Sequence, residues 1–154
     1  MKIRIDFDGT VTTHDFPKIG KEIGAVPVLK ELVAQGHQLI LFTMRSDVET
    51  PTSLDPDIIC ESGDFLTQAV NWFKENDIPL FGIQTNPEQH RWTSSPKAYG
   101  ELIIDDTALG SPLTRKRDGK IYHHRPFINW TMIRLLLIER GILKTFNQKR
   151  QRNT

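Results

Sequence analysis

The sequence of 154 residues has one cysteine, no long apolar run and no apolar stretch at its start. The single cysteine, Cys60, can form no disulfide within the chain and cannot by itself build a thiolate metal cluster. The longest wholly apolar runs, 39–42 and 135–138, are far shorter than the roughly 20 residues that cross a bilayer. These absences argue against a disulfide-stabilised secreted domain, a signal peptide and a membrane protein, and we expect a cytoplasmic location.

The charge is divided unevenly along a chain whose total formal charge is only +1. Residues 1–113 carry a net charge of −8, and residues 114–154 carry +9. A basic block of this kind is typical of a solvated face with a frayed end. The alternative is that the block holds a phosphate-rich or acidic partner.

Periodicity predicts strands that alternate with helices. Alternating Ile3, Ile5 and Phe7 predict a strand over residues 2–7, and the apolar run at 38–43 is typical of a strand buried on both faces. Proline-rich polar stretches predict loops at 46–63 and 86–97, the latter with room for a short helix. The remaining predicted elements are helices at 25–36, 66–73 and 129–140, and strands at 80–84, 101–105 and 119–123.

Polar side chains follow the ends of the predicted strands. Asp6 and Asp8 end the first strand, Thr43 ends the second, and Asp105 and Asp106 end the fourth. Ligands of parallel sheets bind beyond the carboxyl ends of the strands, so these groups are expected to converge. Carboxylates so close would repel one another unless a cation neutralised them, and oxygen ligands favour Mg²⁺. The alternative is that each acid caps a separate strand or helix.

The segment Ile-Arg-Ile-Asp-Phe-Asp-Gly-Thr-Val, residues 3–11, resembles the first motif of the haloacid dehalogenase-like phosphohydrolase superfamily. Thr43 fits the second motif of that family, Lys97 the third, and the pair Asp105-Asp106 the fourth. All four motifs lie between residues 3 and 106, in the same order as in the family. The chain after about residue 113 takes no part in the resemblance.

The resemblance implies a role for each matching residue. Asp6 would attack phosphorus and become an aspartyl phosphate. Asp8 would protonate the leaving oxygen and then accept a proton from water. Thr43, with amide groups near Gly9 and Met44, would hold the phosphoryl oxygens.

Two cationic residues and the metal ligands complete this implied site. Lys97 would offset the charge on Asp6 and on the transferring group. Arg45 would bind substrate phosphate or pair with a nearby acid, and the sequence does not decide between the two. The implied ligands of Mg²⁺ are Asp6, Asp8 through its carbonyl, Asp105 and Asp106.

The predicted fold class is α/β, a three-layer Rossmann-like sandwich with a mostly parallel central sheet. Residues 1–143 would form a single phosphatase domain, and residues 144–154 a basic tail. The gaps at 11–24 and 86–96, where members of the family carry cap domains, are too short to hold one. The resemblance therefore implies a capless member with no separate cap domain.

The function expected from these residues is Mg²⁺-dependent hydrolysis of a phosphate monoester on a phosphorylated small molecule or macromolecule. One alternative is a non-catalytic module that keeps the metal and phosphate site and holds a partner. Another is a phosphatase of nucleic-acid ends. The lack of an aromatic stacking stripe disfavours nucleic acid as a partner. Membrane binding is not expected, and a homo-oligomer is left open.

Overall fold

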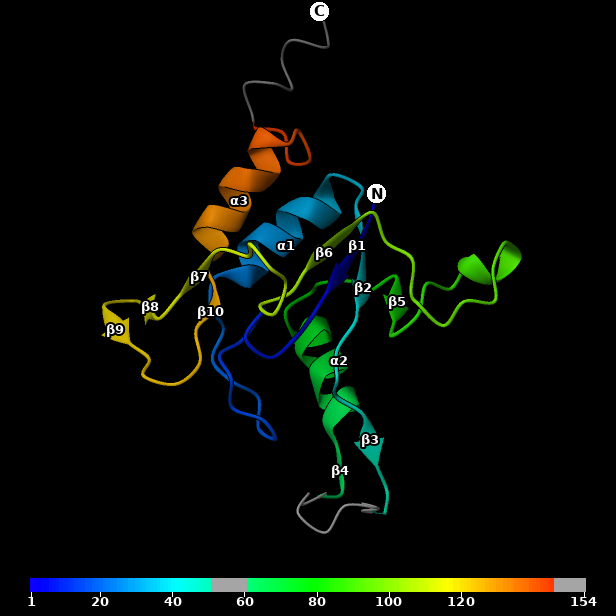
Figure 1. The fold of residues 1–154 in the computed structure, drawn as a ribbon, viewed down its shortest axis with the longest axis horizontal. Helices are drawn as coiled ribbons and strands as arrows, with labels where there is room; N and C mark the ends of the chain where they lie inside the picture. The colour runs from blue at the N-terminus through cyan, green and yellow to red at the C-terminus, as the bar shows by residue number, and fades with distance from the viewer. Residues whose placement is uncertain (51–60, 146–154) are drawn as a thin grey trace, which may run out of the picture.

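The computed structural model describes residues 1–50 and 61–145 and has a parallel four-stranded sheet at its centre (Figure 1). Its strand order is β5-β2-β1-β6, and Ile5 pairs with Leu41 on one side and with Ile104 on the other. The strands are β1 (Lys2–Ile5), β2 (Gln38–Leu41), β5 (Gly82–Ile83) and β6 (Leu102–Ile104). The class, α/β with a parallel sheet, is therefore confirmed.

Three helices, α1 (Ala25–Ala34), α2 (Phe65–Glu75) and α3 (Trp130–Glu139), cover one face of the sheet. The helix α1 connects β1 to β2 and α2 connects β2 to β5, so both crossovers step the same way across the sheet. Right-handed crossovers in the same direction place their helices on the same face. The chain then returns past β2 and β1 to form β6, so the strand order reverses between β1 and β6.

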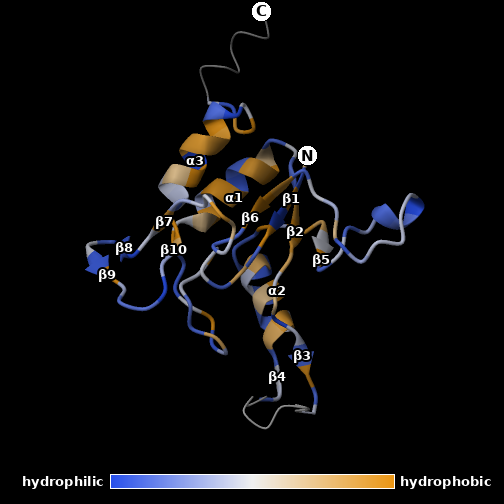
Figure 2. Cartoon of the chain, in the orientation of Figure 1, coloured by the Kyte–Doolittle hydropathy of each residue, from blue (hydrophilic) through white to orange (hydrophobic). Residues whose placement is uncertain are grey.

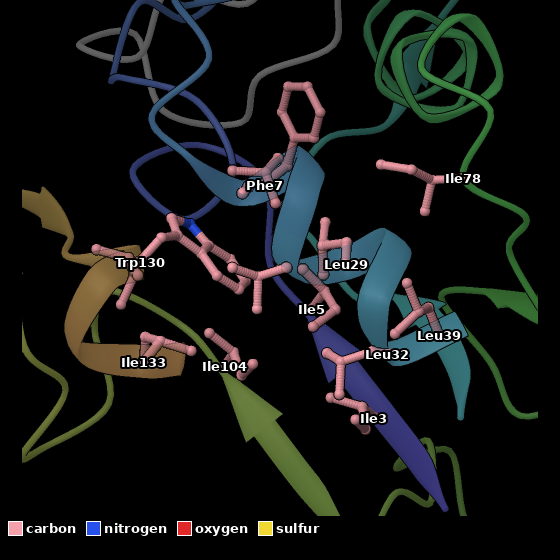
Figure 3. Packing of buried hydrophobic residues seen from close by; sticks show 14 of the residues in the cluster. Ile3, Ile5, Phe7, Leu29, Leu32, Leu39, Ile78, Ile104, Trp130 and Ile133 are labelled. Atoms are coloured by element: carbon pink, nitrogen blue, oxygen red, sulfur yellow. The ribbon is translucent and has the colours of Figure 1, made fainter. Parts of the chain in front are cut away.

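The core lies between this face and the three helices (Figure 3). Side chains that alternate along the strands, Ile3 and Ile5 on β1 and Leu39 on β2, are fully buried there. They pack with Leu29 of α1, and Phe7 packs edge-on against Trp72 of α2 with ring centroids 5.7 Å apart. Burial of a side chain of this size contributes about 1.5–3 kcal/mol.

On the other face of the sheet, the segment 85–101 lies beside Arg4 of β1 and, within the described residues, holds only a short 3-10 turn, η1 (Gln89–Arg91). Long cationic side chains lie on aromatic rings there. Arg4 lies 5.7 Å from the ring centroid of Phe42, and Lys2 lies 5.4 Å from that of Phe81. A three-layer sandwich is accordingly not confirmed, because prolines and polar residues keep this segment from forming a covering helix.

Three pairs of short antiparallel strands lie outside the central sheet (Figures 1 and 2). The prediction of a loop over residues 46–63 is wrong at both ends, where residues 47–48 pair with residues 63–64 as antiparallel strands. The predicted strand 119–123 is confirmed only for two residues. The pairs are β3 (Asp47–Val48) with β4 (Gly63–Asp64), β7 (Leu113–Thr114) with β10 (Phe127–Ile128), and β8 (Lys116–Arg117) with β9 (Lys120–Ile121).

Some predictions lie outside the described residues. They concern Cys60, the middle of the loop 46–63, and nearly all of the tail 144–154. Among the helices that the structure does describe, none has the length and apolarity needed to cross a bilayer.

Candidate metal and phosphoryl-transfer site

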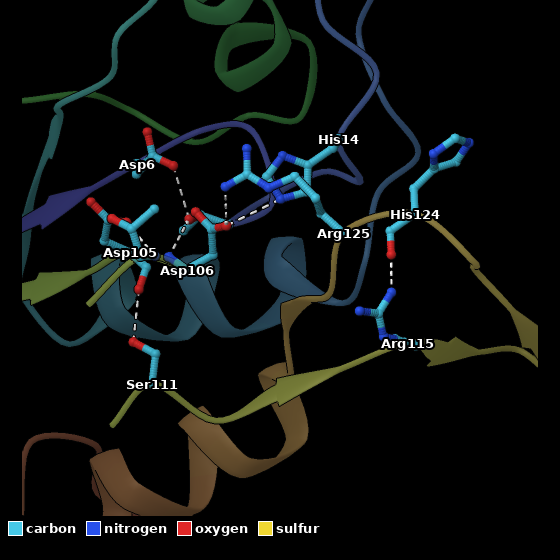
Figure 4. A network of polar contacts seen from close by, with 10 residues as sticks. Asp6, His14, Asp105, Asp106, Ser111, Arg115, His124 and Arg125 are labelled. Carbon is cyan, nitrogen blue, oxygen red and sulfur yellow. Dashed lines mark hydrogen bonds and ion pairs between the residues drawn. The ribbon is translucent and has the colours of Figure 1, made fainter. Parts of the chain in front are cut away.

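Three of the predicted carboxylates meet where the strand order reverses, between the carboxyl ends of β1 and β6 (Figure 4). One oxygen each of Asp6, Asp105 and Asp106 lies within 4.8 Å of the others. Asp6 directly follows β1, and its amide donates to the carbonyl of Ile104 at 3.1 Å. The parallel pairing of β1 with β6 thus brings together residues a hundred positions apart, as the sequence predicts.

Burial and like charge act together on Asp6. The pKa of Asp6 is raised to about 7, with burial as the largest cause and the charges of Asp105 and Asp106 as further contributions. Burial is also the first cause of a raised pKa at Asp106, with the charge of Asp105 adding to it. The cluster therefore favours a bound proton or a bound cation.

The hydroxyl of Thr10, which the sequence analysis did not single out, connects two members of the cluster. It donates to Asp6 Oδ2 at 3.0 Å and accepts from the amide of Asp106 at 3.1 Å. The indole Nε1 of buried Trp130 donates to the carbonyl of Thr10 at 2.6 Å, so α3 holds this turn in place. The spacing of Thr10 from Asp6 gives no signal for these contacts, which depend on the folded turn.

Two cationic or titratable side chains contact Asp106, and the sequence analysis missed both. His14 Nε2 lies 3.1 Å from Asp106 Oδ2, and Arg125 lies 3.8 Å from the same oxygen. Arg125 comes from the segment between β9 and β10, and its side chain is two-thirds exposed. The other carboxylate, Asp105, accepts at Oδ1 from the amide and hydroxyl of Thr107.

Gly9 has a structural reason to be glycine. Its φ is +77°, and a Cβ there would collide with the ring of His14 and lie 2.8 Å from Asp106 Oδ2. Its amide donates to the carbonyl of Thr12 at 2.8 Å. Gly9 therefore permits the close approach of His14 to the cluster. For the predicted contact with phosphate, the Gly9 amide would have to give up its hydrogen bond to Thr12 and donate to a phosphoryl oxygen instead.

Asp8 is bound by Arg45 rather than gathered into the carboxylate cluster. Arg45 Nε and Nη2 donate to the two oxygens of Asp8, each at 2.7 Å. The guanidinium also donates to the carbonyls of Pro17 and Lys18, and Arg45 is only 2% exposed. Of the two alternatives for Arg45, the structure has the ion pair with a nearby acid. Both oxygens of Asp8 therefore accept charge-assisted hydrogen bonds from the same guanidinium.

The pairing of β1 with β2 ends at Ile5 and Leu41. If this register is continued by two residues, Thr43 lies beside Phe7, next to the first motif. Gln84, missed by the sequence analysis, holds its backbone. Gln84 Oε1 accepts from the amide of Thr43 at 3.0 Å, and Nε2 donates to the carbonyl of Thr43 at 2.6 Å. The side chain of Met44 is 96% exposed just beyond this point.

Lys97 is not brought to the carboxylates. It lies in the segment before β6, and the start of a parallel strand is at the sheet edge opposite to its carboxyl end. Lys97 lines a cavity of about 300 Å³ together with Arg4, Trp92 and Gly100. Its assignment as a catalytic residue stays a prediction that this placement does not support.

The residues present fit a hard divalent cation. All three converging side chains offer carboxylate oxygens, which are the donors that Mg²⁺ takes in proteins. Burial is the main cause of the raised pKa of Asp6, and a cation would offset the repulsion by Asp105 and Asp106 that adds to it. Donor chemistry alone does not select Mg²⁺ from other hard cations such as Mn²⁺.

The raised pKa of Asp6 predicts how pH acts on the metal-free protein. Between the ordinary value of 3.8 and about 7, the folded protein binds more protons at Asp6 than the unfolded chain does. Stability from this group is therefore full at low pH and falls as pH rises through that range. With EDTA present, we expect Asp6→Asn to gain stability relative to wild type between pH 4 and pH 7.5, measured by urea unfolding. A constant difference across that range would contradict the assignment.

Comparison with known proteins supports the fold and gives no activity. No protein-family model matches the chain, and no curated protein matches it. A solved structure described as a conserved protein from Bacteroides thetaiotaomicron is similar, with 29% identity and a TM-score of 0.64. The match covers 96% of this chain and 94% of the other. The two proteins thus share an α/β architecture over nearly their full lengths.

Proposed function

We propose that the protein is a Mg²⁺-dependent phosphatase that hydrolyses a phosphate monoester through a phosphorylated Asp6. The observation that carries this proposal is the meeting of Asp6, Asp105 and Asp106 at the point where the strand order reverses. The resemblance of residues 3–11 to the first motif of the haloacid dehalogenase-like superfamily supports the choice of Asp6 as nucleophile.

In the proposed reaction, Asp6 is the nucleophile and Asp8 transfers the protons. A carboxylate oxygen of Asp6 forms a bond to phosphorus as the ester oxygen leaves, and Asp8 gives a proton to that oxygen. Water then attacks the aspartyl phosphate, Asp8 takes its proton, and Asp6 and inorganic phosphate are released. A cation held by Asp6, Asp105 and Asp106 would neutralise charge on the transferring group.

The contacts of Arg45 limit how Asp8 can transfer protons. The guanidinium donates to both oxygens of Asp8, so the leaving oxygen has to approach a carboxylate that already accepts two hydrogen bonds. The pair also holds the loop after Asp8 through Pro17 and Lys18. This arrangement favours the alternative of a non-catalytic metal-binding module.

Hydrolysis of p-nitrophenyl phosphate with Mg²⁺ and with EDTA tests the proposal. We expect turnover with Mg²⁺ and none after chelation, with activity restored when Mg²⁺ is returned. Activity that survives full chelation would contradict the metal assignment. Mg²⁺ binding by calorimetry without hydrolysis of any monoester would instead favour the non-catalytic module.

The basic side chains around the carboxylate cluster give a second prediction. Arg125 and His14 contact Asp106, whereas Lys97 lies by the amino-terminal half of the sheet. We therefore expect Arg125→Ala to lower kcat/KM by about ten-fold, the scale of one charge-assisted contact. The Lys97→Ala variant is the matched control and should stay within about two-fold of wild type. The reverse order of effects would restore the role that the sequence assigns to Lys97.

A further inference from the structure

A cavity of about 450 Å³ opens beside the loop that follows Thr43. Two of its apolar side chains are unusually exposed, Met44 at 96% and Phe16 at 58%. Phe65, at the start of α2, packs edge-on against Phe16 with ring centroids 5.1 Å apart. The lining residues are Phe16, Pro17, Met44, Ser46, Val48, Glu61 and Phe65.

Chain neighbours and side-chain contacts connect the walls of this cavity to the proposed phosphoryl site. Met44 directly follows Thr43, whose backbone is held by Gln84. On the other side, the guanidinium of Arg45 that binds Asp8 also donates to the carbonyl of Pro17. The same guanidinium lies 5.0 Å from the ring centroid of Phe7 and 5.1 Å from that of Phe16. The residue proposed to protonate the leaving oxygen is thus tied to a wall of the cavity.

The lining is suited to an uncharged group. Glu61 is the one charged side chain among the described residues that line the cavity. Its carboxylate repels a second phosphate or carboxylate on a substrate. Aromatic rings and the thioether of Met44, in contrast, make favourable contacts with an aromatic ligand.

We propose that this cavity receives the leaving group of the substrate, and that this group is an uncharged aromatic one. The inference rests on the proposed phosphatase function and narrows it to aryl-type phosphate monoesters. The phosphoryl group would be transferred to Asp6 while the ring lies against Met44 and Phe16. The ester oxygen would then face Asp8, which supplies its proton.

The test compares three phosphate monoesters of phenols: phenyl, 2-naphthyl and 4-carboxyphenyl phosphate. Wild type should hydrolyse the 2-naphthyl ester with kcat/KM about ten-fold above the phenyl ester, because the larger ring adds apolar contact. The carboxylated ester should be the poorest of the three. Met44→Ala should lose most of the naphthyl preference, and Glu61→Gln should improve the carboxylated ester relative to the phenyl ester.

Met132→Ala is the matched control, since Met132 is an exposed methionine on α3 away from this cavity, and it should keep the wild-type preference. A wild-type enzyme without the preference, or a Met44→Ala variant that hydrolyses and retains it, would overturn the inference. Failure to hydrolyse any ester would contradict the proposed function instead. In that case, a fluorescence titration with 2-naphthol tests whether the cavity binds an aromatic group. Binding that Met44→Ala weakens would support the inference, and the absence of binding to wild type would overturn it.

Discussion

The Asp6→Asn variant is expected to lose hydrolysis of aryl phosphates to the level of the uncatalysed background. The substitution removes the nucleophile and one of the three carboxylates that converge at the reversal of strand order. It also removes the charge that burial and the neighbouring acids make unfavourable, so the variant should fold at least as stably at neutral pH without metal. Initial rates with saturating Mg²⁺, and unfolding midpoints with EDTA, measure the two effects.

Asp15→Asn is the matched control for this experiment. Asp15 is an exposed carboxylate of the same loop region, so its substitution changes the same charge outside the cluster. It should leave the rate within about two-fold of wild type. An Asp6→Asn variant that turns over near the wild-type rate would remove the covalent mechanism.

The second large effect is on stability, at Arg45. This guanidinium is 2% exposed and donates four hydrogen bonds, two of them to Asp8. Arg45→Ala leaves the Asp8 carboxylate and two carbonyls without their donor. Removal of one partner from a buried pair typically costs about 3–5 kcal/mol. We expect a loss of free energy of unfolding on that scale, measured by urea denaturation.

An exposed pair of the same geometry serves as the control. Arg134 donates to both oxygens of Glu31 between α3 and α1, but both side chains are about two-fifths exposed. Surface pairs contribute about 0.2–1 kcal/mol. Arg134→Ala should therefore cost far less than Arg45→Ala. Equal losses for the two variants would show that the Arg45 pair is not a buried structural contact.

The carboxylate cluster could be predicted because it depends on strand order along the chain. Asp6 and the pair Asp105-Asp106 each follow a strongly apolar strand, and parallel strands put their carboxyl ends at one edge. The contacts of Thr10, His14 and Gln84 could not be predicted in this way. Most of these contacts join residues 41–96 positions apart, and one joins the Thr10 hydroxyl to Asp6 within the same turn. All of them depend on side-chain geometry after folding.

The assignment of Lys97 depends on the resemblance and on its place before Asp105, and the three-layer fold depends on helices on both faces of the sheet. The sequence predicts the segment 86–97 itself as loop with room for a short helix. The prolines at 87 and 96 limit helix formation there, and the segment, as described, holds only a short 3-10 turn. Likewise, nothing in the spacing of Asp8 and Arg45 indicates that they form an ion pair.

The most direct test of the account is to find the phosphoryl group on Asp6. In Asp8→Asn the nucleophile remains, but water lacks its base, so the second step should slow by about 10²–10⁴-fold. After mixing with acetyl phosphate and Mg²⁺, intact-mass measurement should show one added phosphoryl group that hydroxylamine removes. Peptide mapping should place it on Asp6, and the Asp6→Asn/Asp8→Asn double variant should not gain it. A phosphoryl group on another residue, or an equal gain by the double variant, would contradict the account.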